Sequence, residues 1–113
     1  MHEMSLCESI VGVLEAAARE QQFSRVRRVR LTVGALAGVE LTALRFGFEV
    51  VSRDTLADGA TLEILPRPGQ AYCFQCGDTV SIQQRFDPCP GCGGHRLQVT
   101  GGDELKIKDL EVE

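Results

Sequence analysis

The sequence has no tryptophan, only one tyrosine, and no apolar run close to the length of a membrane span. Because a helix needs about 20 consecutive apolar residues to cross a bilayer, we expect no membrane insertion. The chain begins Met1-His2-Glu3, without the basic segment and apolar run of a secretory signal. We therefore expect a soluble protein in a reducing, cytoplasmic setting.

Basic residues are in the minority, since 12 Lys and Arg stand against 16 Asp and Glu, giving a formal net charge of -4. This acidic balance argues against a bulk affinity for nucleic acid. The only basic cluster contains Arg25, Arg27, Arg28 and Arg30. It fits the solvent face of a strand better than a docking site for an acidic partner, although both interpretations stay open.

The signatures of catalysis are also missing. We find no paired general acid and base and no nucleophile with a base to activate it. The sequence therefore predicts a protein that is not an enzyme.

Four of the five cysteines form two pairs with the spacing of metal ligands. Cys73 pairs with Cys76 and Cys89 with Cys92, and twelve residues separate the two pairs. Two intervening residues let both sulfur atoms of a pair reach one ion from a tight turn, so two such turns supply a tetrahedral zinc site. Because four protein thiolates leave no coordination position open for a substrate, we expect structural Zn(II).

Three other uses of these cysteines fit the sequence less well. Two disulfides would need an oxidising compartment. A redox motif normally has a single CxxC beside a βαβ unit. The string Pro88-Cys89-Pro90-Gly91-Cys92 matches one half of the zinc deaminase signature, but the H-x-E half is absent because His2 and Glu3 are adjacent.

Hydrophobic periodicity predicts two helices, from Met4 to about Gln22 and from Glu40 to about Ser52. We expect Val13 on the buried stripe of the first helix and Phe46 at the margin of the second. Cys7 flanks the first stripe and is interpreted as a small buried residue.

Alternating apolar residues predict strands over 29–33 and 61–64, and Pro66 and Pro68 should end the second strand. The order strand, helix, strand favours a right-handed βαβ unit with parallel strands. The tail 104–113 alternates as well, with a change of phase near Lys108-Asp109 that a bulge would accommodate. We expect this tail to return to the sheet as its third strand.

The predicted fold class is therefore α+β, with an α/β-like body. Two helices lie on a small three-stranded mixed sheet, into which a four-cysteine zinc ribbon is inserted. We expect one domain over residues 1–69 plus 101–113 and a zinc-binding domain over 70–100.

The other end of the chain carries a second candidate metal site. His2 should precede the first helical turn, beside a terminal amine and two backbone amides. An amine, a deprotonated amide and an imidazole can surround one ion in a plane, an arrangement that Ni(II) and Cu(II) favour. On spacing alone, an exposed and functionless histidine is the commoner outcome.

Taken together, these features resemble the HypA/HybF family of hydrogenase maturation nickel chaperones over essentially the whole chain. The resemblance is carried by Met1-His2-Glu3, the CxxC-x12-CxxC segment, Phe46-Gly47-Phe48-Glu49 and Glu104-Leu105-Lys106-Ile107. It implies a nickel metallochaperone in which His2 and nearby backbone nitrogens hold Ni(II) as cargo. It also implies structural zinc on Cys73, Cys76, Cys89 and Cys92, a HypB-type GTPase partner, and delivery to the large subunit of [NiFe]-hydrogenase.

The alternative is a zinc-ribbon module that binds nucleic acid or protein and delivers no metal. The ribbon's aromatic residues are Tyr72, Phe74 and Phe86, which is few for a stacking surface. Glu3 is interpreted as a carboxylate at the positive end of the first helix, and a second role as a nearby metal ligand through its backbone nitrogen or carboxylate stays open. His95 is interpreted as a surface residue or a hydrogen-bond donor to a thiolate.

Overall fold

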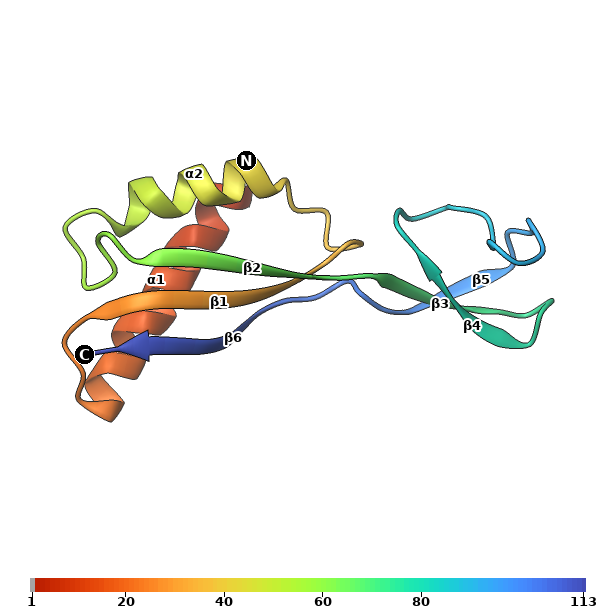
Figure 1. Ribbon diagram of the computed structural model, residues 1–113. Helices are drawn as coiled ribbons and strands as arrows, with labels where there is room; N and C mark the ends of the chain where they lie inside the picture. Colours follow the sequence, from red (N-terminus) through yellow and green to blue (C-terminus); the bar gives the residue numbers. More distant parts are fainter. Residues whose placement is uncertain (1) are drawn as a thin grey trace. The chain divides into compact units, whose positions relative to one another are not determined.

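The computed structural model describes residues 2–113 (Figure 1). The elements in chain order are α1 (His2–Gln21), β1 (Val26–Gly34), α2 (Leu41–Ser52), β2 (Thr61–Arg67), β3 (Gly69–Cys73), β4 (Asp78–Ile82), β5 (Leu97–Gly101) and β6 (Leu105–Val112). The chain divides into two compact units. The first contains the chain up to Leu31, Val39–Ile64 and Ile107–Glu113, and the second contains Thr32–Gly38 and Leu65–Lys106. Over residues 2–113, neither helix combines the length and apolarity that a bilayer crossing requires.

The first unit is built on a three-stranded sheet in the order β2-β1-β6. Strands β1 and β2 run in the same direction and β6 runs the opposite way, so the sheet is mixed (Figure 1). The predicted parallel strands, the return of the tail as the third strand, and the fold class are confirmed. The predicted end of β2 is wrong, because Pro66 lies inside this strand. An edge strand can hold a proline since one side of its backbone has no ladder bond to make.

Helices α1 and α2 pack against each other through small and apolar side chains. Ile10, Leu14, Leu44 and Phe48 are buried at this contact or in the adjoining core. Cys7 is also buried, as predicted, and its thiol donates a hydrogen bond to the carbonyl of Leu44 at 3.4 Å. The close packing of the two helices holds their first turns side by side (Figure 1).

Two of the predicted core positions are wrong. Val13 is 54% exposed and Phe46 is 64% exposed. Their neighbours Val11 and Gly47 take the inward positions instead, so each buried stripe is narrower than the apolar residues of the sequence suggest. A helix can bury only the face that a neighbouring element covers.

Two arginines of the basic cluster, Arg28 and Arg30, lie in β1 and face acidic partners on the neighbouring strands. Arg28 is 3.3 Å from Glu63 of β2, and Arg30 makes two hydrogen bonds of 2.7 Å to Asp109 of β6. Arg28 and Arg30 are therefore neutralised within the sheet, which supports their interpretation as a solvent face rather than as a docking site for an acidic partner.

The second unit contains an antiparallel sheet in the order β4-β3-β5. Its core is small and consists of Leu36, Ala71 and Ile82, with Val80, Leu97 and Val99 packed around it. Leu36 comes from the segment that follows β1, so a residue far from the ribbon in sequence completes the ribbon's core.

Glycines allow chain segments of the second unit to cross at very short range. A Cβ atom on Gly34 would lie 2.0 Å from the carbonyl oxygen of Gly102, and one on Gly102 would lie 2.5 Å from the Cα of Gly69. No larger residue fits these positions without displacing the backbone.

Candidate metal centre

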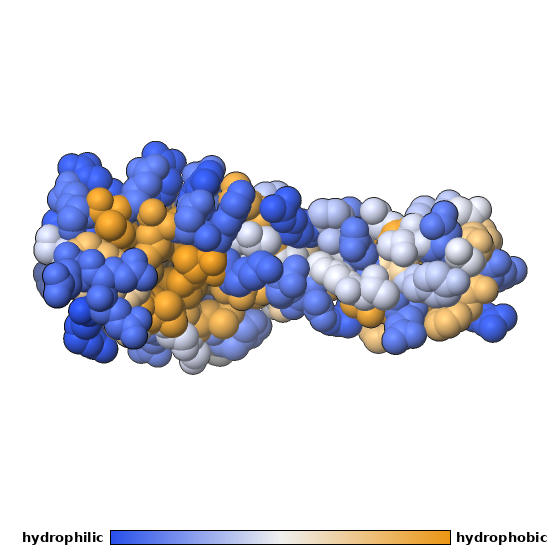
Figure 2. Space-filling view, turned by 90° about the horizontal axis from the view of Figure 1, so that it is seen from below, coloured by the Kyte–Doolittle hydropathy of each residue, from blue (hydrophilic) through white to orange (hydrophobic). Residues whose placement is uncertain are grey.

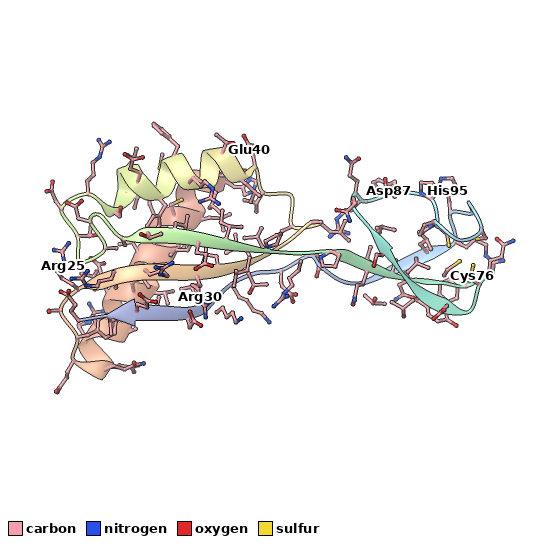
Figure 3. All side chains as sticks on the ribbon, viewed as in Figure 1. Arg25, Arg30, Glu40, Cys76, Asp87 and His95 are labelled. Carbon is pink, nitrogen blue, oxygen red and sulfur yellow. The ribbon has the colours of Figure 1, made fainter. Side chains whose placement is uncertain are left out.

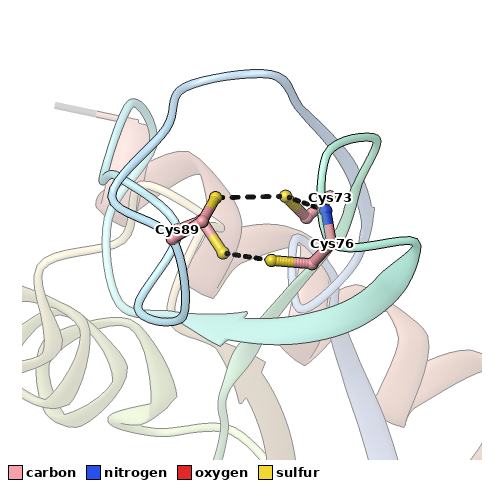
Figure 4. A group of neighbouring side chains, drawn as sticks. Cys73, Cys76 and Cys89 are labelled. Atoms are coloured by element: carbon pink, nitrogen blue, oxygen red, sulfur yellow. Dashed lines mark hydrogen bonds between the residues drawn. The ribbon is translucent and has the colours of Figure 1, made fainter.

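The four paired cysteines converge on one point in the second unit. Their sulfur atoms all lie within 4.8 Å of one another. Figure 4 shows the sulfur atoms facing each other, and the distances from Cys73 to Cys92 and from Cys76 to Cys89 are both 3.8 Å. With zinc–sulfur bonds of about 2.3 Å, two sulfurs of a tetrahedral site are about 3.8 Å apart. The cluster therefore fits a single tetrahedral Zn(II).

The two cysteine pairs adopt the same local structure. Each pair is followed by a glycine in the left-handed region, with φ of 69° at Gly77 and 74° at Gly93. Each glycine N–H donates to the carbonyl of the first cysteine of its pair, Cys73 or Cys89, at 2.8 Å. In both turns a backbone N–H also donates to the sulfur of that first cysteine at 3.3 Å. A repeated turn of this kind places four sulfurs at one centre.

The sulfurs sit in environments that differ in their effect on ionisation. Hydrogen bonds from the backbone N–H of Cys92 and, less strongly, of Gly91 lower the pKa of Cys89 to about 7. The neighbouring thiols, first that of Cys92, raise the pKa of Cys76 to about 12. Four clustered thiols cannot all ionise beside one another without a cation, whereas a zinc ion deprotonates the sulfurs that bind it. The donor set is chemically suited to a dication.

The four sulfurs leave no coordination position of a tetrahedral ion open. Cys73 and Cys89 are buried, while Cys76 and Cys92 are exposed, and Figure 3 shows sulfur atoms gathered beside Cys76. Four sulfurs complete a tetrahedral shell, so this arrangement suits a structural ion. His95 is exposed and is not one of the residues whose ligand atoms converge. It borders a hollow of about 180 Å³ together with Phe86.

At the other candidate site, the structure places His2 in the first turn of α1. The expectation that His2 precedes the helix is wrong, because α1 begins at His2 and not near Met4. An acidic residue in the first turn, Glu3, favours this early start by interacting with the positive end of the helix. The terminal amine of Met1, which belongs to the predicted nickel site, lies outside the described residues.

His2 is surface-accessible and lies beside a carboxylate. Its side chain is 59% exposed, and its Nε2 atom is 3.5 Å from Oε2 of Glu3. Glu3 in turn accepts a hydrogen bond of 3.2 Å from the backbone N–H of Glu40, which holds the pKa of Glu3 down at about 2. Glu3 therefore has a tertiary role beyond the helix dipole, since it joins the starts of α1 and α2.

Sequence reasoning did not identify Glu40 as part of this region. Glu40 is the N-cap of α2 and its carboxylate accepts a hydrogen bond from the backbone N–H of Thr42. Figure 3 shows Glu40 at the start of α2. The cap could have been predicted from its position before the apolar repeat, but its bond to Glu3 could not, since the two residues are far apart in sequence.

Comparison with known proteins gives consistent matches along the chain. Residues 1–112 match the family model described as hydrogenase/urease nickel incorporation, metallochaperone, hypA. The hydrogenase maturation factor HypA of Alkalilimnicola ehrlichii is 68% identical over 113 residues, covering all of both chains. That of Beijerinckia indica is 58% identical over 112 residues, covering 99% of each chain. The solution structure of the Ni metallochaperone HypA from Helicobacter pylori has a TM-score of 0.70 at 23% identity, covering 99% of this chain and 97% of that one, and shows a shared fold.

Proposed function

Since the chain belongs to the HypA family of nickel-incorporating metallochaperones, we propose that it binds Ni(II) at His2 and helps to insert the ion into a hydrogenase during maturation. The full-length match to the family, with relatives named as hydrogenase maturation factors, carries this proposal. The exposure of the His2 imidazole supports a surface site for the ion.

The two candidate sites suit different metals because their ligand atoms differ. Four thiolates on Cys73, Cys76, Cys89 and Cys92 favour zinc and enclose it, which suits an ion that stabilises the fold. The imidazole of His2 and neighbouring backbone nitrogens favour nickel in square-planar or related geometry. An accessible site with few side-chain ligands can both collect an ion and release it.

Nitrogen ligands alone do not exclude copper, which binds more strongly than nickel to the same donors. Selectivity must then come from metal availability and from docking to the correct proteins. We propose a HypB-type GTPase as the protein that cooperates in loading and release, and the large subunit of [NiFe]-hydrogenase as the recipient. In this function the chain carries an ion and catalyses no covalent step.

The proposal is tested by replacing the proposed nickel ligand. His2→Ala removes the only side-chain nitrogen at that site, so nickel affinity should fall by at least about tenfold, a loss comparable to or larger than that of outer-shell changes at metal sites. Isothermal titration with Ni(II) measures the affinity, and zinc analysis of the same sample should show an unchanged content.

His95→Ala is the matched control because it removes the only other histidine of the chain. It should leave nickel affinity unchanged. Undiminished nickel binding by His2→Ala, or an equal loss in both variants, would contradict the assignment of the site to His2.

A further inference from the structure

The two edges of the three-stranded sheet are not equally protected. An edge strand presents unpaired backbone groups to which another strand can bind. At the β2 edge, Arg45 of α2 donates a hydrogen bond of 3.1 Å to the carbonyl of Leu62, and α2 runs alongside this strand (Figure 1). Over residues 2–113, no side chain is hydrogen-bonded to the backbone of β6. The β6 edge is therefore the open one.

The sequence of β6 is complementary to itself when two copies run antiparallel. In one register every apolar residue faces an apolar residue and every lysine faces a carboxylate. The four pairs are Leu105 with Val112, Lys106 with Glu111, Ile107 with Leu110, and Lys108 with Asp109. A shift by one residue in either direction would instead place Lys108 opposite Lys108 or Asp109 opposite Asp109, and like charges directly opposite each other destabilise a strand pair.

A symmetric pair also requires that facing residues lie on the same side of their own strand, because a two-fold axis through the sheet keeps every side chain on its face. Ile107 and Leu110 would lie on opposite faces of a regular strand. In β6, however, the alternation breaks at Lys108 and Asp109, which are both exposed, while Ile107 and Leu110 are both half-buried. The break therefore brings Ile107 and Leu110 to one face, as the symmetric register needs.

The charges on β6 are arranged for such a pair. Asp109 and Glu111 are held near β1, by two hydrogen bonds from Arg30 and by a contact of 3.4 Å to Arg28 respectively. A carboxylate accepts more than one hydrogen bond, so both retain capacity for a second cation. Lys106 and Lys108 are exposed and have no salt bridge within residues 2–113.

The surface beside the open edge is also partly apolar. Figure 2 views the molecule from the side on which β6 is the outer strand in Figure 1, and a band of apolar side chains crosses the first unit there. Val112 of β6 itself is 42% exposed. Pairing of β6 strands would remove apolar surface from water in addition to forming ladder bonds.

We propose that two copies of this chain associate through antiparallel pairing of their β6 strands, in the register that places Lys108 of one copy opposite Asp109 of the other. The result is a continuous six-stranded sheet with two-fold symmetry. A second copy is the partner at the open edge because the charges of β6 are complementary to those of an antiparallel copy of the same strand.

Charge reversal tests this interface in the full-length, zinc-loaded chain. Sedimentation velocity over a concentration series should show a monomer–dimer equilibrium for the unmodified protein. Lys106→Glu with Lys108→Glu places carboxylates opposite carboxylates, so the dimer dissociation constant should rise by about tenfold or more. Lys106→Arg with Lys108→Arg keeps the charge and should keep the dimer. Circular dichroism of each variant establishes that the fold is retained.

Carbodiimide cross-linking reports the register directly, because Lys106 and Lys108 are the only lysines of the sequence. In a mixture of ¹⁵N-labelled and unlabelled protein, mass spectrometry should find Lys106–Glu111 and Lys108–Asp109 links that join a labelled to an unlabelled peptide. A protein that stays monomeric, a dimer that charge reversal does not weaken, or cross-links confined to other carboxylates would overturn the proposal. Pairing of β6 with a different protein in place of a second copy would also overturn it.

Discussion

Single residues decide how closely the two helices of the first unit approach. A Cβ atom on Gly47 of α2 would lie 3.0 Å from the sulfur of Cys7 in α1. Gly12 of α1 has no atom within 4 Å of the corresponding point. The two glycines are both helical, yet only Gly47 is required by packing.

Substituting these two glycines should therefore have opposite effects. Gly47→Val forces the helices apart and should lower the free energy of unfolding by about 1–3 kcal/mol, as overpacking does. Gly12→Ala meets no neighbour and should raise it by about 0.5–1 kcal/mol, because alanine favours a helix more than glycine does. Urea denaturation of both variants measures the effects, and a stabilised Gly47→Val protein would contradict the close approach.

Some residue contacts could be predicted from the sequence and others could not. The convergence of Cys73 and Cys76 could be predicted because a short turn fixes both sulfurs. The burial of Leu36 against Ala71 and Ile82 could not, since nothing near Leu36 indicates which distant strands it contacts. The assignment of His2 as a nickel ligand stays a prediction.

At the scale of elements, β1 is linked to its neighbours by charged side chains as well as by ladder bonds. The guanidinium of Arg30 holds the pKa of Asp109 below its ordinary value through a two-point hydrogen bond between β1 and β6. A carboxylate with a lowered pKa in the folded state adds stability above its unfolded pKa of about 3.9 and loses that contribution as the pH falls through the folded value. The β1–β6 link should thus weaken only in strong acid.

The pKa of Asp109 can be measured from its carboxyl ¹³C shift during an NMR titration. It should lie below the ordinary value in the unmodified protein and rise towards that value in Arg30→Gln, where the guanidinium is gone. Arg27→Gln removes a different partner, since Arg27 pairs with Glu113, and should leave the pKa of Asp109 in place. An unchanged Asp109 pKa in Arg30→Gln would assign the effect to another group.

The types of the long elements were predictable, whereas their limits were less so. Apolar repeats identified both helices and the three strands of the first unit, because burial of one face imposes the repeat. The start of α1 depends on Glu3, whose carboxylate accepts a hydrogen bond from the backbone N–H of Glu40. The continuation of β2 through Pro66 depends on the position of β2 at the edge of the sheet. Both are tertiary effects that a local pattern does not contain.

At the scale of the whole molecule, the two units have cores of different strength. The apolar cluster of the second unit is small, with Leu36, Ala71 and Ile82 at its centre, so the fold of this unit should depend on the metal. Structural zinc supplies on the order of 10–16 kcal/mol of apparent binding free energy in small zinc domains.

Removal of zinc with a strong chelator under reducing conditions should unfold the second unit and leave the first folded. Hydrogen exchange followed by mass spectrometry should show loss of protection in β3, β4 and β5, with α1 and α2 still protected. Cys76→Ser should reproduce this loss without a chelator. Cys7→Ser, which changes a cysteine outside the cluster, should retain zinc and the protection of all three strands, and persistence of β3–β5 without metal would contradict the expectation.

Leu36 also sets a practical limit on dissecting this protein. A peptide cut to the contiguous stretch 65–106 would keep all four sulfurs and yet lack the leucine that fills the space above Ala71 and Ile82. Such a fragment should coordinate metal while leaving an apolar cavity where Leu36 belongs. Its metal affinity would therefore differ from that of the intact chain. Supplying the missing loop, by fusion or as a separate peptide, should repair the fragment.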